Sequence, residues 1–288
     1  MVKKEYKRLL FSYATIILVA AETALACVSY YFSYLQRNVY INEYNTGAED
    51  LNLEAMKNLI DSYNGFKYFF TYYEYSEEAY VGIILAFAWL GIFLSCLVCR
   101  WKENGYGNFL VSRKGYAFFF KNMLAAQSLY IATVLGIIFA LQLLAAFAVG
   151  GLKTPGYLSH GSYLSFLIIF CLYLINVFYF VSINIIVSSL SCFIRNKYVL
   201  QAFPVLVFAL LPLLAADVLP AIFTWADTLF SHLMVVICPF EYLLVIVSMM
   251  RNFYSSDLAG LFVSFGLFAL CSVILAGINV TKLKKDFI

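Results

Sequence analysis

Long apolar runs are the feature that most restricts what this chain can fold into. Six such runs recur along the sequence, and each is long enough to cross about 30 Å of hydrocarbon at about 1.5 Å per helical residue. They cover residues 9–32, 79–98, 123–149, 163–187, 198–216 and 258–280. Only 12% of the residues are charged, against about 25% in soluble globular domains. The sequence therefore predicts an all-α membrane protein that forms a single transmembrane domain over residues 1–288.

Lysine and arginine are distributed unequally over the two sets of connections. Fourteen flank the N-terminus, the second-to-third and fourth-to-fifth connections and the C-terminus, whereas five lie elsewhere. Cytoplasmic loops of membrane proteins collect Lys and Arg. We therefore expect both termini in the cytoplasm, residues 99–122 on the same side, and a location in the cell membrane.

The N-terminal run has two interpretations. Basic residues before an apolar stretch, and the sequence Ala24-Leu25-Ala26-Cys27, are typical of a cleaved or lipidated leader. Glu22 interrupts the run just before that point, and the apolar character continues through Phe32. This pattern favours an uncleaved first helix over a removed leader.

Glu22 is then an intramembrane carboxylate, which is costly and by default marks a functional site such as a translocation path. The alternative is a structural role, in which Glu22 faces the protein interior and bonds to a Ser or Tyr of another helix. The sequence leaves both open. Asn176 and Asn184 in the fourth run are candidates for hydrogen bonds between helices.

Residues 33–78 form the predicted first outer loop. Within it, apolar residues from Leu51 to Tyr63 follow helical spacing, and Asp50 and Gly65 suit the two ends of a short amphipathic helix. We expect this helix to lie on the outer leaflet or against the spans. An aromatic belt at the membrane interface is expected from Tyr68, Tyr72, Tyr73, Tyr75 and Tyr80, with substrate contact as the less favoured interpretation.

Residues 217–257 are apolar in places but broken by Pro220, Pro239 and charges. We expect a re-entrant or interfacial helical pair, because non-helical backbone at membrane depth must be covered by protein. Two further spans are the competing interpretation.

A polar segment separates the second and third runs. After Glu103, the side chains of Tyr106, Phe109 and Leu110 share one helical face, and Arg113 and Lys114 follow. This spacing predicts a short amphipathic helix parallel to the inner membrane surface. An ordinary basic loop would account for the lysines and arginines, but not for the order of acidic, aromatic and basic residues.

Several kinds of chemistry lack their sequence signature. No Gly-rich loop ends in Gly-Lys-Ser or Gly-Lys-Thr, so no ATP-binding P-loop is expected. Hydrolase motifs of the Gly-x-Ser-x-Gly and His-Glu-x-x-His types are also missing. We expect a non-enzymatic chain with no cofactor, no metal and no nucleic-acid partner.

The segment between the second and third runs resembles the first inner loop of the permease subunits of bacterial ABC-2 type ABC transporters. The matching residues are Glu103, Gly105, Phe109, Leu110, Ser112, Arg113 and Lys121, without the usual Pro before Ser-Arg. A second match is Cys238-Pro239-Phe240-Glu241-Tyr242-Leu243, which is similar to the family's Asn-Pro-x-x-Tyr segment with Cys238 in place of Asn. Six spans and inside termini extend the resemblance over nearly the whole chain.

The resemblance implies a transporter that moves, and in most cases exports, an amphipathic substrate such as an antimicrobial peptide, a lipid or a drug. A second permease copy or a homologous permease, together with a separate ATPase subunit that binds ATP and Mg²⁺, would complete it. The coupling helix that contacts the ATPase would carry Glu103, Gly105, Phe109, Leu110, Arg113 and Lys121. The exit gate would lie near Pro239, Glu241 and Tyr242.

The main alternative is a membrane-embedded sensor or accessory subunit without transport activity, and a membrane enzyme ranks third. The sequence does not give the substrate, the direction of transport, or whether two identical permeases pair.

Overall fold

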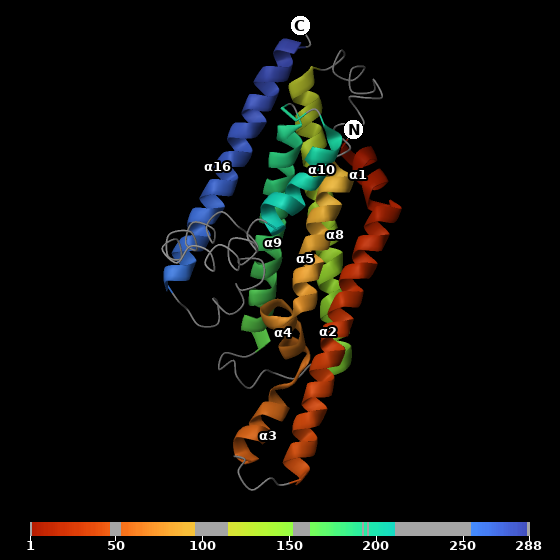
Figure 1. The fold of residues 1–288 in the computed structure, drawn as a ribbon, viewed down its shortest axis with the longest axis vertical. Coiled ribbons are helices and arrows are strands. Elements are labelled where there is room, and N and C mark those ends of the chain that lie inside the picture. Colours follow the sequence, from red (N-terminus) through yellow and green to blue (C-terminus); the bar gives the residue numbers. More distant parts are fainter. Residues whose placement is uncertain are drawn as a thin grey trace.

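The computed structural model describes residues 2–46, 53–95, 115–151, 162–191, 193–194, 196–210 and 255–286. Within these residues the chain forms helices and no β-strand. Five of the described helices are long and apolar enough to cross a membrane, as expected for a multi-pass membrane protein. They form an elongated bundle, with α2 (Tyr13–Thr46) along one flank and α16 (Ser255–Asp286) along the other (Figure 1).

The first span differs from its predicted bounds. A short helix, α1 (Val2–Leu10), precedes a break in the helix at Phe11 and Ser12, and α2 then continues to Thr46 rather than ending near residue 32. The chain has no Pro or Gly between residues 13 and 46 to stop the helix. The last turns of α2 therefore carry mostly polar residues and continue the helix beyond the apolar run.

The third span is also longer than predicted. Helix α8 (Tyr116–Gly150) begins seven residues before Met123, because Gly115 stands just before it with a φ of 79°. A positive φ favours glycine and interrupts a right-handed helix. Gly151 has a φ of 70° and ends the same helix.

The fourth and sixth predicted runs correspond to α9 (Ser162–Leu190) and α16. Polar side chains join these two helices along their length. The Tyr179 hydroxyl donates to Ser264 Oγ at 2.8 Å, and Asn279 Nδ2 donates to the Ser189 carbonyl at 2.8 Å. Asn279 Oδ1 also accepts from the Tyr116 hydroxyl at 2.7 Å, which ties the start of α8 to the end of α16.

The second run forms α5 (Glu77–Trp89) and continues as a π-helical stretch, η1 (Leu90–Ser95). Here the backbone packs closely against α10 (Lys197–Val205). A Cβ atom on Gly91 would lie 2.1 Å from the Gln201 carbonyl oxygen, so only glycine fits at this crossing.

The fifth predicted span is only partly described. Helix α10 contains Pro204 and passes into the π-helical η2 (Leu206–Leu210). The apolar helix Lys197–Phe208 is shorter than a membrane span, and residues 211–216 lie outside the described residues. The predicted coupling segment up to residue 114, and the predicted re-entrant pair up to residue 254, also lie outside them.

Two helices occupy the predicted outer loop. The amphipathic helix expected there is confirmed as α3 (Leu53–Ser62), which packs against α2. Its predicted end at Gly65 is wrong, because α3 ends at Ser62 and Gly65 begins the next helix, and Asp50 lies outside the described residues. A second helix, α4 (Gly65–Tyr75), follows and packs mainly against α8. Its N-terminus is fixed by Asn64, whose side chain accepts from the Lys67 amide at 2.9 Å, and by the Gly65 amide, which donates to the Gly151 carbonyl at 3.1 Å.

The expected aromatic belt is wrong for three of its five tyrosines. Tyr68, Tyr72 and Tyr73 are buried in the core, packed among rings such as Tyr30 and Phe139. The physical reason is that α4 carries apolar and aromatic side chains around most of its circumference, so it is buried between other helices instead of resting at the interface. Tyr80 is partly exposed.

The two ends of the bundle differ in charge. Helix α1, the start of α8, the start of α10 and the end of α16 lie toward one end, where both termini are found (Figure 1). The described basic residues of these segments are Lys3, Lys4, Lys7, Arg8, Lys121, Lys197, Lys282, Lys284 and Lys285. Arg37, Lys57 and Lys67 lie on α2, α3 and α4 toward the opposite end.

Candidate functional site

Glu22 lies in the first third of α2, within its apolar part, and faces the interior of the bundle. Its side chain is buried, with 7% of its surface exposed. Helix α5 approaches it through Gly82, where a Cβ atom would lie only 2.6 Å from Glu22 Oε2 and 3.2 Å from the Tyr72 hydroxyl oxygen. The absence of a side chain at residue 82 therefore makes room for the carboxylate and the phenol side by side.

A chain of hydrogen bonds beside Glu22 links three helices. The Tyr73 hydroxyl on α4 donates to Gln142 Oε1 on α8 at 2.6 Å. Gln142 Nε2 in turn donates to the backbone carbonyl of Glu22 on α2 at 3.3 Å. Gln142 is completely buried, so these bonds satisfy an amide that would otherwise be costly at this depth.

A cavity of about 30 Å³ adjoins the Glu22 carboxylate. This is room for one water molecule, if polar partners are present. Four polar residues line it: Glu22, Tyr72, Tyr73 and Asn176. The remainder of the wall is apolar and comes from Ala79, Ile83, Ala86, Leu135, Ile138, Phe139 and Phe180.

A second buried polar group lies further along α8. Asn184 Nδ2 on α9 donates to Gln127 Oε1 at 3.0 Å, and Gln127 Nε2 donates to the Leu94 carbonyl at 3.4 Å. Both amide side chains are buried. This contact joins α9, α8 and the π-helical η1, and it bears out Asn184 as a residue that bonds between helices. The Asn176 side chain instead donates to the Leu172 carbonyl of its own helix.

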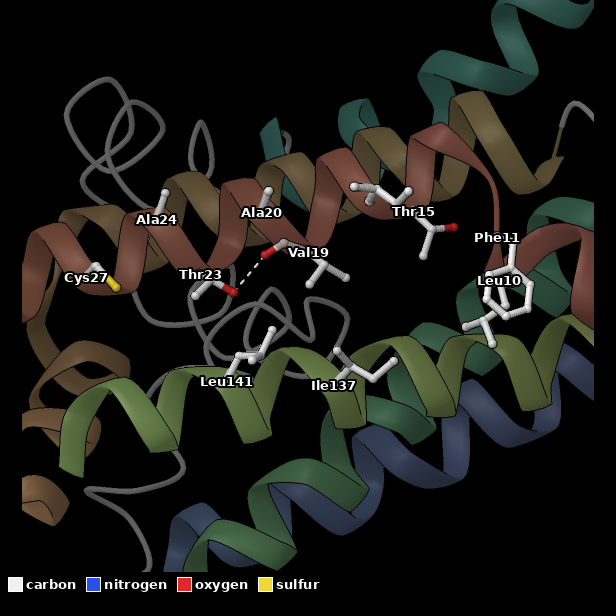
Figure 2. A pocket seen from close by; sticks show the side chains of 11 residues that line it. Leu10, Phe11, Thr15, Val19, Ala20, Thr23, Ala24, Cys27, Ile137 and Leu141 are labelled. Atoms are coloured by element: carbon white, nitrogen blue, oxygen red, sulfur yellow. Dashed lines mark hydrogen bonds between the residues drawn. The ribbon is translucent and has the colours of Figure 1, made fainter. Parts of the chain in front are cut away.

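An apolar groove runs between α2 and α8 on the outside of the bundle (Figure 2). Its volume is about 670 Å³, within the range of sites for drug-sized ligands. Ile137 and Leu141 of α8 face Val19 and Thr23 of α2 across it. Thr23 is one of its few polar residues, and its hydroxyl bonds to the Val19 carbonyl. The groove therefore suits an aliphatic chain better than a polar ligand.

The structure describes only two of the sequence-predicted site residues. Glu22 is buried at the cavity, and Lys121 is exposed near the start of α8. Lys121 precedes Gln142 by 21 residues on one helix, or about 30 Å at 1.5 Å per residue, so the two predicted positions are far apart. The following lie outside the described residues: Glu103, Gly105, Phe109, Leu110, Arg113, Pro239, Glu241 and Tyr242.

The neighbours of Glu22 and the buried amide Gln127 are the residues that the sequence did not predict. Gln127 and Gln142 carried a usable signal, because buried amides within an apolar run favour bonds between helices. Tyr72 and Tyr73 gave no such signal, since their pattern matches that of interfacial tyrosines. Gly82 stands in an ordinary apolar run, and its role is visible only from its distance to Glu22.

No protein-family model, curated protein or solved structure matches this chain significantly.

Proposed function

We propose that the chain is the membrane-spanning permease subunit of an ABC-type transporter, which moves an amphipathic substrate using ATP hydrolysed by a partner subunit. The observation that carries the proposal is a set of polar side chains buried inside apolar spans. These are Glu22, Gln142, Gln127 and Asn184. Polar and ionisable residues at membrane depth are costly, and they commonly mark pathways for substrates or ions.

The apolar groove between α2 and α8 supports an amphipathic substrate. It is lined almost entirely by aliphatic and small side chains, and an acyl chain or an apolar peptide side chain would bury its surface there. Lipids, apolar peptides and apolar drugs share this chemistry. Export is favoured over import because such molecules partition into the membrane, from which a permease can take them.

The energy source is proposed to lie on another chain. No P-loop is present in the sequence, so an ATPase subunit would have to bind the cytoplasmic face. Residues 103–113 are the proposed contact with this ATPase subunit, because they resemble the coupling helix of ABC-2 permeases. Pairing with a second permease, identical or homologous, completes the proposal.

The test is ATP-dependent movement of a fluorescent phospholipid in vesicles that contain the chain and the ATPase recovered with it. Thr23→Trp places a large ring in the groove, because the Thr23 side chain points toward α8 (Figure 2), so we expect transport to fall several-fold. Ala269→Trp places the same ring on α16, at a residue exposed outside the groove, and should leave transport near the wild-type rate. Equal rates for the two variants would contradict a role for the groove.

The same experiment separates the proposal from its alternative. If the ATPase binds the chain but ATP drives no movement of phospholipid, peptide or drug probes, the chain is a sensor or accessory subunit instead.

A further inference from the structure

Among the described residues, the Glu22 carboxylate has no ionic partner. Of the residues that line its cavity, none is Lys, Arg or His. An isolated carboxylate in an apolar interior is strongly disfavoured, and such a group takes up a proton or a cation. Glu5, the other buried glutamate among the described residues, differs because Arg8 lies 3.1 Å from its Oε2 atom.

The surroundings of Glu22 are shaped around its carboxyl group. Within the described part of the chain, Oε1 is buried and has no hydrogen-bond partner. Oε2 and the Tyr72 hydroxyl occupy the space that a side chain at residue 82 would fill. The carboxyl group therefore has one oxygen beside a phenol and one still lacking a partner.

The adjoining cavity has room for a water molecule that can donate a hydrogen bond to Glu22 Oε1. Its volume of about 30 Å³ holds one water molecule, and a buried water needs two to four polar partners. Glu22, Tyr72, Tyr73 and Asn176 provide them from α2, α4 and α9. A metal ion fits less well, because hard cations such as Ca²⁺ take about six to eight oxygen ligands, and this lining holds a single carboxylate.

We propose that Glu22 is a proton-binding site, at which the carboxylate exchanges a proton with a water molecule held in this cavity. On uptake, a new O–H bond forms at the carboxylate while a hydronium ion loses one O–H bond and becomes water. The carboxyl group changes from −1 to neutral, and release reverses each step. No oxidant, reductant or further reactant takes part.

The other titratable groups that face Glu22 do not replace it in this exchange. They are Tyr72 and Tyr73 of α4, whereas the lining residues of α5, α8 and α9 carry no acid or base. Burial raises the pKa of the Tyr72 phenol, and the Glu22 carboxylate raises it further. Burial likewise raises the pKa of Tyr73. Both phenols therefore stay protonated at neutral pH and act as hydrogen-bond donors. Tyr30 of α2 and Glu78 at the start of α5 also raise the pKa of Tyr72.

The test is infrared difference spectroscopy of the full chain in lipid vesicles as the pH is lowered. We expect a C=O band of one protonated carboxyl group to grow, and to shift when H₂O is replaced by D₂O. The band should be missing from Glu22→Gln and retained in Glu5→Gln. Identical pH-difference spectra for the wild type and Glu22→Gln would overturn the proposal.

Further variants test the same assignment by the midpoint of the titration. If Glu22→Gln does not fold, Glu22→Asp keeps a carboxyl group and should titrate with a shifted midpoint; an unchanged wild-type band in that variant overturns the assignment. Gly82→Ala should shift the midpoint as well, whereas Gly136→Ala, whose Cβ meets only Tyr173 atoms at 3.6 Å or more, should not.

The proton is distinguished from a metal ion by repeating the titration in sodium chloride and in choline chloride of equal ionic strength. An equal midpoint in both salts supports a proton site. A midpoint that falls with sodium overturns it in favour of a cation site. The inference does not require the proposed transport function, so either can fail alone.

Discussion

The side-chain amides of a few buried residues form hydrogen bonds between the helices of this bundle. Gln127 and Asn184 bond to each other between α8 and α9 in the interior, and Gln142 bonds to two other helices about four turns away on α8. In membrane proteins such bonds contribute about 0.6 kcal/mol on average and up to about 1.7 kcal/mol. They therefore orient the helices more than they stabilise them.

A double-mutant cycle tests this pair. Gln127→Leu and Asn184→Leu should show a coupling free energy of about 0.6–1.7 kcal/mol in the free energy of unfolding, because each removes the same hydrogen bond. Gln127→Leu combined with Gln142→Leu is the matched control, and its effects should add to within about 0.5 kcal/mol. Additive effects in the first pair would show that the Gln127–Asn184 bond does not form.

The sequence predicts the importance of Glu22 but not the residues around it. The sequence places a carboxylate inside a span, and it therefore indicates a site or a hidden partner. Its neighbours Tyr72, Gly82, Gln142 and Asn176 come from four other helices. Such contacts join residues far apart in the chain, so periodicity within one helix cannot predict them.

At the scale of elements, α4 is held against α8 by backbones in close contact. The Gly65 amide bonds to the Gly151 carbonyl, and a Cβ on Gly150 would lie 2.5 Å from both Asn64 C and Gly65 N. Backbone atoms cannot move aside as the end of a flexible side chain can. The position of α4, and with it Tyr72 and Tyr73, depends on this contact.

Gly150→Ala should therefore destabilise the protein by about 1–3 kcal/mol, since overpacking forces the backbones apart. Gly277→Ala is the control, because a Cβ there meets no described atom within 4 Å. It should leave stability unchanged or raise it by up to about 1 kcal/mol. Thermal unfolding in detergent measures both, and equal midpoints for the two variants would contradict the close packing of α4 on α8.

The elements divide clearly into those that the sequence predicts and those that it does not. The apolar runs that correspond to α2, α5, α8, α9 and α16 are predicted because membrane thickness demands about 20 apolar residues in a row. Helix α3 is predicted from its spacing. Helix α4 is not, because aromatic residues on most of its faces give no helical periodicity. The ends of α2 and α8 are missed. Polar residues continue α2 beyond its apolar run, and Gly115 and Gly151 determine where α8 begins and ends.

At the scale of the whole molecule, the bundle gathers most described basic residues at the end where both termini lie (Figure 1). Positive charge is retained on the cytoplasmic side of membrane proteins. The end that carries α1 and the last turns of α16 is therefore expected to face the cytoplasm, with α3 and α4 outside.

Cysteine labelling tests this orientation. In a cysteine-free version of the chain, Thr46→Cys at the end of α2 should react with an impermeant maleimide on intact cells. Thr281→Cys near the end of α16 should react only after the membrane is opened. Both residues are exposed, so access depends on the side of the membrane, and the reverse pattern would contradict the predicted orientation.

The ATPase partner remains a proposal, and purification of the chain from mild detergent after gentle crosslinking tests whether an ATPase is bound. We expect mass spectrometry to find an ATPase subunit with a P-loop together with the wild-type chain. Glu103→Arg and Arg113→Glu should lose that subunit, whereas Glu54→Arg and Lys57→Glu, which make the same charge changes on α3, should retain it. Recovery of the wild-type chain without any ATPase would contradict the proposed pairing.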